Sequence, residues 1–320
     1  MASDKENLSH GQRTGIDPAD MRMNLRQLEA FKAVVDAGSI RAAARVLQLT
    51  QPAVTHTVRE LERGIGAELL QRSVRGVEPT ALGLALYRRA HLLVNELRRA
   101  REEMAQLRDG TGGRVSIALS SAAAAQLLPP ALTAFRALRP GVELELQEIS
   151  WPAMDTRWQG GDYDFAVISE LDEDARDGLE REVLFAMPMV LAVRTGHPMA
   201  RTRSVLRLSD QTWLLPGYGH EALRRVFAAL GHAAPRDIIF CHSAAIALEI
   251  VRQVDAVGMV SSMLFRNEIA SRNLVALPLR DKLPQARVSI VVRDVHSVTP
   301  AARLLMECLR RAASRTGTTR

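Results

Sequence analysis

The N-terminal part of this chain is organised around one stretch, residues 39–65, which reads SIRAAARVLQLTQPAVTHTVRELERGI. This stretch predicts two short helices joined by a tight turn. Ser39 can cap the first helix and Thr50 the second, because their side-chain oxygens can accept from the free N–H groups of a first turn. Pro52 is tolerated near the start of the second helix, where its missing N–H has no helical partner.

Both predicted helices have an apolar face at helical spacing. In the first helix this face comprises Ala42, Ala43, Val46 and Leu47. In the second it comprises Val54, Val58, Leu61 and Ile65. The second helix also presents a face of hydrogen-bonding side chains: Gln51, Thr55, His56 and Arg59. Such a face suits the DNA major groove, but any small helical bundle has capped helices and a polar face, so the pattern alone leaves both interpretations open.

The segment that follows favours DNA binding. Residues 69–80 read LLQRSVRGVEPT, a turn-rich hairpin pattern with Arg72 and Arg75 near a bend at Gly76. A basic wing beside a recognition helix can reach phosphates or the neighbouring minor groove.

Residues 24–80 resemble the winged helix-turn-helix of the LysR-type transcriptional regulators. The matching segments are LRQLEAF, GSIRAAARVL, TQPAVT and RSVRGVEPTALG, in this order. The chain departs from the family at Thr55-His56, where Ser-Arg is common, and in its glycine-rich segment at residues 64–66. The resemblance implies double-stranded DNA as a partner and assigns its contacts to these residues: Gln51, Pro52, Thr55, His56, Arg59, Arg72 and Arg75.

Residues 80–107 predict a long helix with a heptad seam: Leu86, Ala90, Leu93, Leu97, Ala100, Met104 and Leu107. Such a seam either packs on its own domain or pairs two chains, and pairing fits better because two DNA half-sites need two binding units. The resemblance implies that residues 81–110 are a linker helix, paired antiparallel in a homodimer. It also implies that homotetramers can form through the effector domains.

A Gly-rich break at residues 109–113 marks a domain boundary. Beyond it strands and helices alternate, which favours an α/β fold with parallel sheets. Residues 180–185 and 189–194 are predicted as separate strands. The order resembles the family's effector domain, with two lobes of periplasmic-binding-protein type, and implies that the chain crosses between the lobes near Arg194 and near Met263. The predicted organisation is a disordered extension (1–21), a winged helix-turn-helix (22–80), a linker helix (81–110) and a two-lobed α/β effector domain (111–320).

Polar residues gather at the predicted strand ends, where open α/β sheets bind small molecules. Hydroxyls and free N–H groups at helix starts can hold a carboxylate or another oxyanion, although each Ser can also simply cap its own helix. Trp151 and His242 can wall a planar group. By the resemblance, these positions surround the cleft of a small-molecule inducer. The candidate residues are Ser120, Ser121, Ser150, Trp151, Ser169, Pro216, Gly217, His242 and Ser243.

Composition and charge limit the partners and cofactors that we expect. The formal net charge of +6 permits nucleic-acid binding without demanding it, and the two cysteines, Cys241 and Cys308, indicate neither a zinc site nor a disulfide framework. No metal or other cofactor is expected. No apolar run approaches transmembrane length, and no signal segment is recognisable, so we expect a cytoplasmic protein with no membrane contact.

Three function classes remain. An effector-responsive transcriptional regulator is favoured, and its effector is expected to be a small organic anion. An α/β enzyme that acts on a small anion and carries an accessory helical domain lacks a recognisable nucleophile–base arrangement, so we expect no enzyme. A solute-binding protein would not need a winged helix. The sequence leaves open the effector, the target promoter, and whether DNA binding activates or represses.

Overall fold

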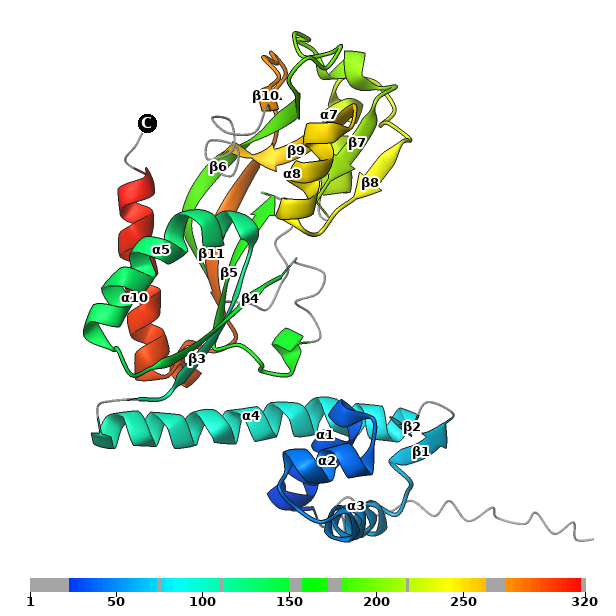
Figure 1. The fold of residues 1–320 in the computed structure, drawn as a ribbon, viewed down its shortest axis with the longest axis vertical. Coiled ribbons are helices and arrows are strands. Elements are labelled where there is room, and N and C mark those ends of the chain that lie inside the picture. Colours follow the sequence, from blue (N-terminus) through cyan, green and yellow to red (C-terminus); the bar gives the residue numbers. More distant parts are fainter. Residues whose placement is uncertain are drawn as a thin grey trace, which may run out of the picture. The chain divides into compact units, whose positions relative to one another are not determined.

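The computed structural model describes residues 23–73, 76–109, 112–149, 157–171, 180–216, 219–262 and 274–317. The chain divides between Asn95 and Glu96 into two compact units (Figure 1). In the described part of the chain, no helix is long and apolar enough to cross a membrane.

The N-terminal unit is a helix-turn-helix followed by a two-stranded hairpin and the start of a long helix. Its elements are α1 (Leu25–Ala37), α2 (Ile40–Val46), α3 (Gln51–Ile65), β1 (Leu70–Ser73), β2 (Gly76–Pro79) and α4 (Ala81–Asp109), the last of which continues into the C-terminal unit.

Local chemistry explains where these helices begin. Asn24 and Gln27 form a capping box at the start of α1. The Thr50 side chain accepts from Ala53 N at 3.4 Å and caps α3 as predicted. Ser39 is the N-cap of α2 but makes no side-chain cap bond.

The predicted inward face of α3 is confirmed, because all four of its apolar residues are buried: Val54, Val58, Leu61 and Ile65. The predicted stripe of α2 is partly wrong. Ala43 and Ala44 are buried there, whereas Val46 is 74% exposed. With only seven residues, α2 buries its small side chains against α1 and α3 and leaves its C-terminal end in solvent.

The hairpin is held against the helices by two close backbone approaches. Gly76 has φ +124°, and a Cβ there would lie 2.5 Å from Gly38 O. Val77 N donates to that same oxygen at 2.9 Å. A Cβ on Gly83 would lie 1.9 Å from Leu69 O, so α4 leaves the hairpin at a distance that only glycine permits.

The C-terminal unit is a mixed sheet covered by helices. Its strands are β3 (Arg114–Leu119), β4 (Glu143–Glu148), β5 (Phe165–Leu171), β6 (Glu180–Arg194), β7 (Thr212–Leu215), β8 (Ile238–Phe240), β9 (Ala256–Ser261), β10 (Leu274–Ala276) and β11 (Gln285–Val292). Its helices are α5 (Ser121–Leu138), α7 (Gly219–Ala229), α8 (Ala244–Gln253) and α10 (Pro300–Gly317). The strand order is β4-β3-β5-β11-β6-β9-β7-β8, with β10 beside β6.

The expected α/β class is confirmed, but the expectation of parallel sheets holds only in part. The pairs β3–β4, β3–β5, β7–β8 and β7–β9 are parallel. The strands β11, β6 and β10 pair in antiparallel fashion with their neighbours. Antiparallel strands in the middle of the sheet let the chain pass from one lobe to the other and return.

The two lobes share one strand, β6. Residues 180–188 of β6 pair with β11 in the first lobe, while residues 189–192 pair with β9 in the second lobe. The chain therefore enters the second lobe beside Pro188, and it returns between β10 and β11. The crossing predicted near Arg194 lies at Pro188 instead, and Met263, the other predicted crossing, lies outside the described residues. The two strands predicted at residues 180–185 and 189–194 are one continuous strand, in which Pro188 lies where one ladder ends and the next begins.

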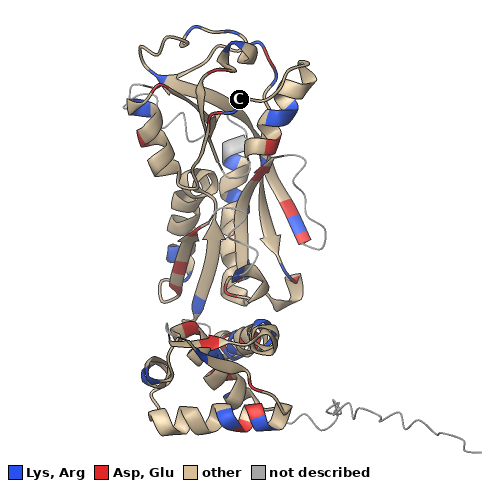
Figure 2. Ribbon diagram, turned by 90° about the vertical axis from the view of Figure 1, so that its right-hand side faces the viewer, with Lys and Arg blue, Asp and Glu red and all other residues tan. Residues whose placement is uncertain are grey.

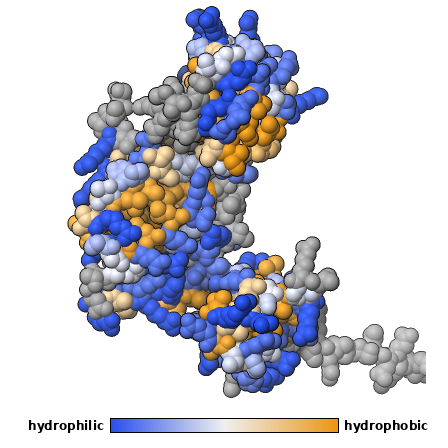
Figure 3. Space-filling model, viewed as in Figure 1, coloured by the Kyte–Doolittle hydropathy of each residue, from blue (hydrophilic) through white to orange (hydrophobic). Residues whose placement is uncertain are grey.

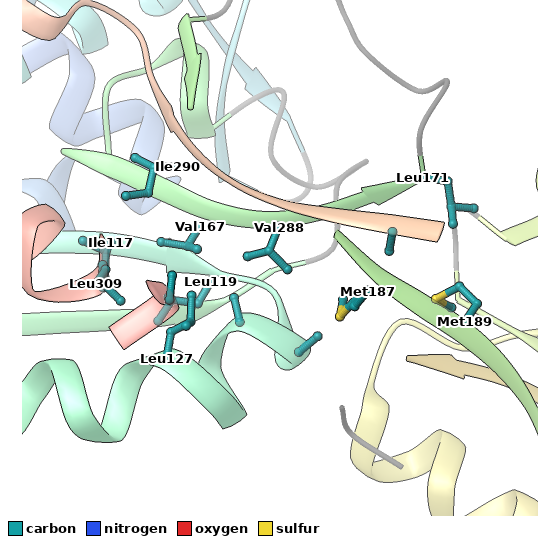
Figure 4. Close-up of a cluster of buried hydrophobic side chains, with 14 of the residues drawn as sticks. Ile117, Leu119, Leu127, Val167, Leu171, Met187, Met189, Val288, Ile290 and Leu309 are labelled. Atoms are coloured by element: carbon teal, nitrogen blue, oxygen red, sulfur yellow. The ribbon is translucent and has the colours of Figure 1, made fainter. Parts of the chain in front are cut away.

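The largest core lies between the sheet and the helices α5 and α10. Figure 4 shows side chains from β3, β5 and β11 meeting Leu127 of α5 and Leu309 of α10. Met187 and Met189 stand on β6 at the passage between the lobes, and both are buried (Figure 4).

The seam of α4 divides between two roles. Leu86 and Ala90 pack into the core of the N-terminal unit. Farther along, the apolar positions lie open: Leu93 is 53%, Met104 59% and Leu107 65% exposed. The part of the chain that the structure describes therefore leaves the second half of the seam largely uncovered.

Candidate DNA-reading surface and effector cleft

The exposed face of α3 carries the predicted DNA-contacting residues. Gln51, Pro52, His56 and Arg59 are exposed, opposite the buried apolar face of the same helix. The first half of α3 has no Lys, Arg, Asp or Glu, and its charges begin at Arg59 (Figure 2). The N-terminal half of the helix therefore offers amide, hydroxyl and imidazole groups, which are suited to base edges.

Two of these side chains also make contacts within α3. The Thr55 hydroxyl donates to Gln51 O at 2.9 Å, which leaves its oxygen as an acceptor and its methyl group for a thymine methyl. His56 Nε2 lies 3.3 Å from Glu60 Oε1, and both side chains are exposed. Arg59 has no ion-pair partner among the described residues, so its guanidinium is available to a phosphate or a guanine.

The hairpin places Arg72 on β1 with its side chain exposed. Arg72 lies opposite Val77 in the β1–β2 ladder, and Ser73 Oγ donates to Glu78 Oε1 across it at 2.9 Å. Arg75 lies outside the described residues. The described part of the hairpin therefore carries one exposed cation, Arg72.

A cavity of about 80 Å³ opens between the two lobes of the C-terminal unit. Five of the predicted effector residues line it: Ser120, Ser121, Ser169, Pro216 and His242. Three more, Ser150, Trp151 and Gly217, lie outside the described residues. In the space-filling view, apolar surface gathers over α5 of the first lobe and around α8 of the second (Figure 3).

Two hydroxyls in the first lobe are left without a hydrogen-bond partner among the described residues. Ser169 is 4% exposed, and its Oγ is one of them. Ser120 is the N-cap of α5, yet its Oγ makes no cap bond and is the other. Ser120 N donates to Val167 O at 2.9 Å, which ties the start of α5 to the strand that carries Ser169. Unpaired buried hydroxyls beside a helix N-terminus suit a bound acceptor.

The other two serines are engaged. Ser121 Oγ donates to Glu148 Oε1 at the end of β4. Ser243 Oγ accepts from Ile246 N at 3.4 Å and so caps α8, and Ser243 is absent from the residues that line the cavity. For Ser243 the plain capping role, which the sequence left open, is the one that the structure shows.

Sequence reasoning missed several cavity residues. Cys241 lines the cavity beside His242, and its thiol donates to Ser243 O at 3.2 Å. Met189 and Met259 line it from β6 and β9. No local pattern marks these residues, because they reach the cavity only through the pairing of β6 with β9. The one available signal was the position of Cys241 as the last residue of the strand predicted at residues 238–241.

A buried ion pair fixes the second half of α4 to the first lobe. Arg99 is 3% exposed, and its Nε donates to Asp164 Oδ1 at 3.1 Å. Its Nη2 donates to Gly161 O at 2.8 Å and to Tyr163 O. Asp164 Oδ2 in turn accepts from Ser116 N at 2.8 Å. Burial lowers the pKa of Arg99, while the charge of Asp164 acts in the opposite direction.

Gln106 lies seven residues after Arg99, on the same face of α4. Its Oε1 accepts from Ala301 N at 3.0 Å, and the residue is buried. The open apolar positions Leu93, Met104 and Leu107 occupy a different face, so docking on the first lobe leaves them free. In the described residues, no cluster of His, Cys, Asp and Glu could hold a metal ion.

Models of two known protein domains match most of this chain. The model of the LysR substrate binding domain matches residues 108–314, and that of the bacterial regulatory helix-turn-helix protein, lysR family, matches residues 25–84. The HTH-type transcriptional regulator GalR of Pseudomonas putida is 29% identical, over 89% of this chain and 73% of its own. The HTH-type transcriptional regulator GbpR of Rhizobium radiobacter is 31% identical, over 74% of this chain and 81% of its own.

Solved structures share the fold of this chain. Full-length CbnR in complex with its target DNA superposes with a TM-score of 0.64 at 23% identity, covering 91% of this chain and 100% of that one. The match of the substrate-binding model alone spans more than half of the present chain. The chain therefore belongs to the LysR family of transcriptional regulators, oligomeric DNA-binding proteins that respond to small-molecule effectors.

Proposed function

We propose that α3 reads operator bases through Gln51, Thr55 and His56, while Arg59 and the wing arginines Arg72 and Arg75 hold phosphates. The observation that carries this proposal is the exposed polar face on the first half of α3, opposite four buried apolar residues. Pro52 fixes the first turn of that helix next to Gln51 and contributes shape.

We assign residues 22–80 to DNA binding, 81–110 to the linker helix and 111–320 to effector binding. Two copies of the chain would pair through the open half of the α4 seam, which presents two DNA-binding units to two half-sites. Because its target is DNA, the protein would work in the cytoplasm. It would release its effector unchanged, as a sensor and not as an enzyme.

The effector would lie in the cavity between the lobes, with an oxygen of a polar or anionic group near Ser120 and Ser169. His242 would face it from the second lobe. Binding that favours one arrangement of the lobes can shift DNA binding only by the difference in its affinity for the two arrangements.

Fluorescence anisotropy with an operator identified by footprinting upstream of the protein's own gene tests the DNA-reading proposal. Gln51→Ala should cost about 1–3 kcal/mol on the operator and little on random DNA, because it removes a base contact. Arg72→Ala should weaken both DNAs alike and reduce the salt slope by roughly one. Arg63→Ala, at the exposed far end of α3 beside Glu60, serves as the control. Equal operator affinity for wild type and both variants would refute the assignment.

A further inference from the structure

The described walls of the cavity hold no carboxylate, ammonium or guanidinium group. Among the described residues that line it, there is no Lys, Arg, Asp or Glu, and the ionisable side chains are Cys241 and His242. A protein that holds a multiply charged small molecule normally supplies opposite charges, because an unpaired buried charge is costly. These walls supply none.

Polar and apolar groups divide between the two lobes. The first lobe contributes the two hydroxyls that have no partner in the described part of the chain, Ser120 Oγ and Ser169 Oγ. The second lobe contributes a largely apolar wall from β7, α8 and β9: Leu214, Leu215, Pro216, Ala247, Leu248 and Val260. Cys241, His242 and Ser261 are the polar residues that this lobe adds.

This division fits a ligand with two unlike ends. A buried hydroxyl such as that of Ser169 gains most from an acceptor oxygen, and the free N–H groups at the start of α5 favour a single negative charge there. Against the second lobe, apolar area removed from water contributes roughly 25 cal/mol per Å², whereas a second charge would lose its hydration and would meet no Lys or Arg among the described lining residues.

We propose that the effector is a small amphiphile with one oxygen-bearing head, neutral or singly negative, held by Ser120 and Ser169 in the first lobe. Its uncharged apolar body lies against the second lobe. Molecules with a charged group at both ends, such as dicarboxylates, are rejected. This inference rests on the proposed location of the effector in the cavity.

The chain contains its own reporter for the second lobe. Cys241 lines the apolar wall, whereas the other cysteine, Cys308, is buried in α10 with 4% exposure. A ligand body that covers this wall also covers the Cys241 thiol. The rate at which iodoacetamide alkylates Cys241, followed by mass spectrometry of the full-length protein, therefore reports occupancy of this end of the cavity.

Three probes of equal chain length separate the ligand classes: hexanoate, hexan-1-ol and adipate. Each is titrated to 10 mM while alkylation of Cys241 is followed. We expect hexanoate and hexan-1-ol to slow alkylation, with adipate at least tenfold weaker than hexanoate. Protection by adipate that equals or exceeds that by hexanoate overturns the inference, and so does a failure of both hexanoate and hexan-1-ol to protect.

Two variants test the orientation. Ser169→Ala should weaken protection by hexanoate roughly tenfold, the scale of a hydrogen bond to a charged group. Ser297→Ala, whose hydroxyl donates to Asp294 O in a distant turn, should leave it unchanged. Thermal melting of both variants verifies that they are folded. Protection that is identical in Ser169→Ala and wild type refutes the assigned head position.

The same titrations, repeated with operator DNA, separate failure of this inference from failure of the proposed function. A dicarboxylate that changes operator binding and protects Cys241 leaves the effector site in the cavity but refutes the chemical class. A ligand of any class that changes operator binding without protecting Cys241 places the effector elsewhere, and then the proposed location itself fails.

Discussion

The proposed recognition helix and the proposed effector cavity both present hydroxyl side chains, yet they differ in what controls the availability of those hydroxyls. On α3 the exposed side is set by helical periodicity alone, and Thr55 bonds within its own helix. In the cavity each hydroxyl depends on a distant segment: Ser121 bonds to Glu148, whereas Ser120 and Ser169 find no partner among the described residues. A local pattern can therefore locate a helical recognition face, but it cannot say which strand-end serine is free.

The largest effect on stability is expected from replacing Arg99, whose distant partners join α4 to the effector domain. Arg99→Ala leaves the Asp164 carboxylate buried without its counter-charge, and we expect a loss of about 3–5 kcal/mol in the free energy of unfolding. Arg98→Ala is the matched control. Its partially exposed pair with Glu102, at 2.8 Å, should contribute less than about 1 kcal/mol. If urea denaturation gives equal losses in the free energy of unfolding for the two variants, Arg99 does not hold α4 to the first lobe as proposed.

The second prediction concerns the open half of the α4 seam. Leu93→Asp should disrupt the dimer, because an uncompensated charge in an apolar interface costs more than about 2 kcal/mol. Ala105→Asp places the same charge at an exposed position of α4 outside the seam and should leave the dimer intact. Light scattering across the micromolar range distinguishes the two. A dimer that tolerates Leu93→Asp moves the interface away from this seam.

The seam of α4 could be predicted from the sequence only in part. The heptad spacing located the apolar positions of α4, but not that Leu86 and Ala90 would pack inside the N-terminal unit. Arg99 lies outside the predicted seam, and contacts with residues 161–164, some sixty positions away, bury it. Local periodicity predicted α2, α3 and α4 and the alternation of strands and helices beyond residue 113. The sharing of β6 by both lobes was not predicted, since it depends on pairing between distant strands.

A smaller effect should separate the two N-cap serines. Ser243→Ala removes the side-chain cap of α8, so we expect a loss of about 0.5–2 kcal/mol in stability. Ser120→Ala removes a hydroxyl that makes no cap bond, so stability should change little. Thermal unfolding measures both. Losses of equal size would mean that Ser120 also stabilises its helix and that its hydroxyl is not reserved for a ligand.

The smallest effect is expected from pH. Burial lowers the pKa of His197, whose Nδ1 accepts from Met199 N at 3.0 Å, with Asp255 and Arg194 as its charged neighbours. The unfolded chain therefore binds a proton more readily than the folded one. Stability should be fully present above about pH 6.5 and should fall as pH drops through the lowered pKa of the folded state. His197→Asn should flatten this slope in denaturation at pH 7.5 and 5.5, and an unchanged slope would rule out His197 as its source.

In the proposed function, occupancy of the cavity controls the binding of DNA by α3. N-ethylmaleimide attached to Cys241 would place an apolar group against the second lobe, and Cys241→Ser treated in the same way provides the control. The measurement is the operator affinity and footprint of the full-length protein before and after complete modification. We expect modification to change the affinity at least threefold or to alter the footprint, and to do neither in Cys241→Ser. A fully modified protein that binds its operator with unchanged affinity and an unchanged footprint would contradict control of DNA binding by the cavity.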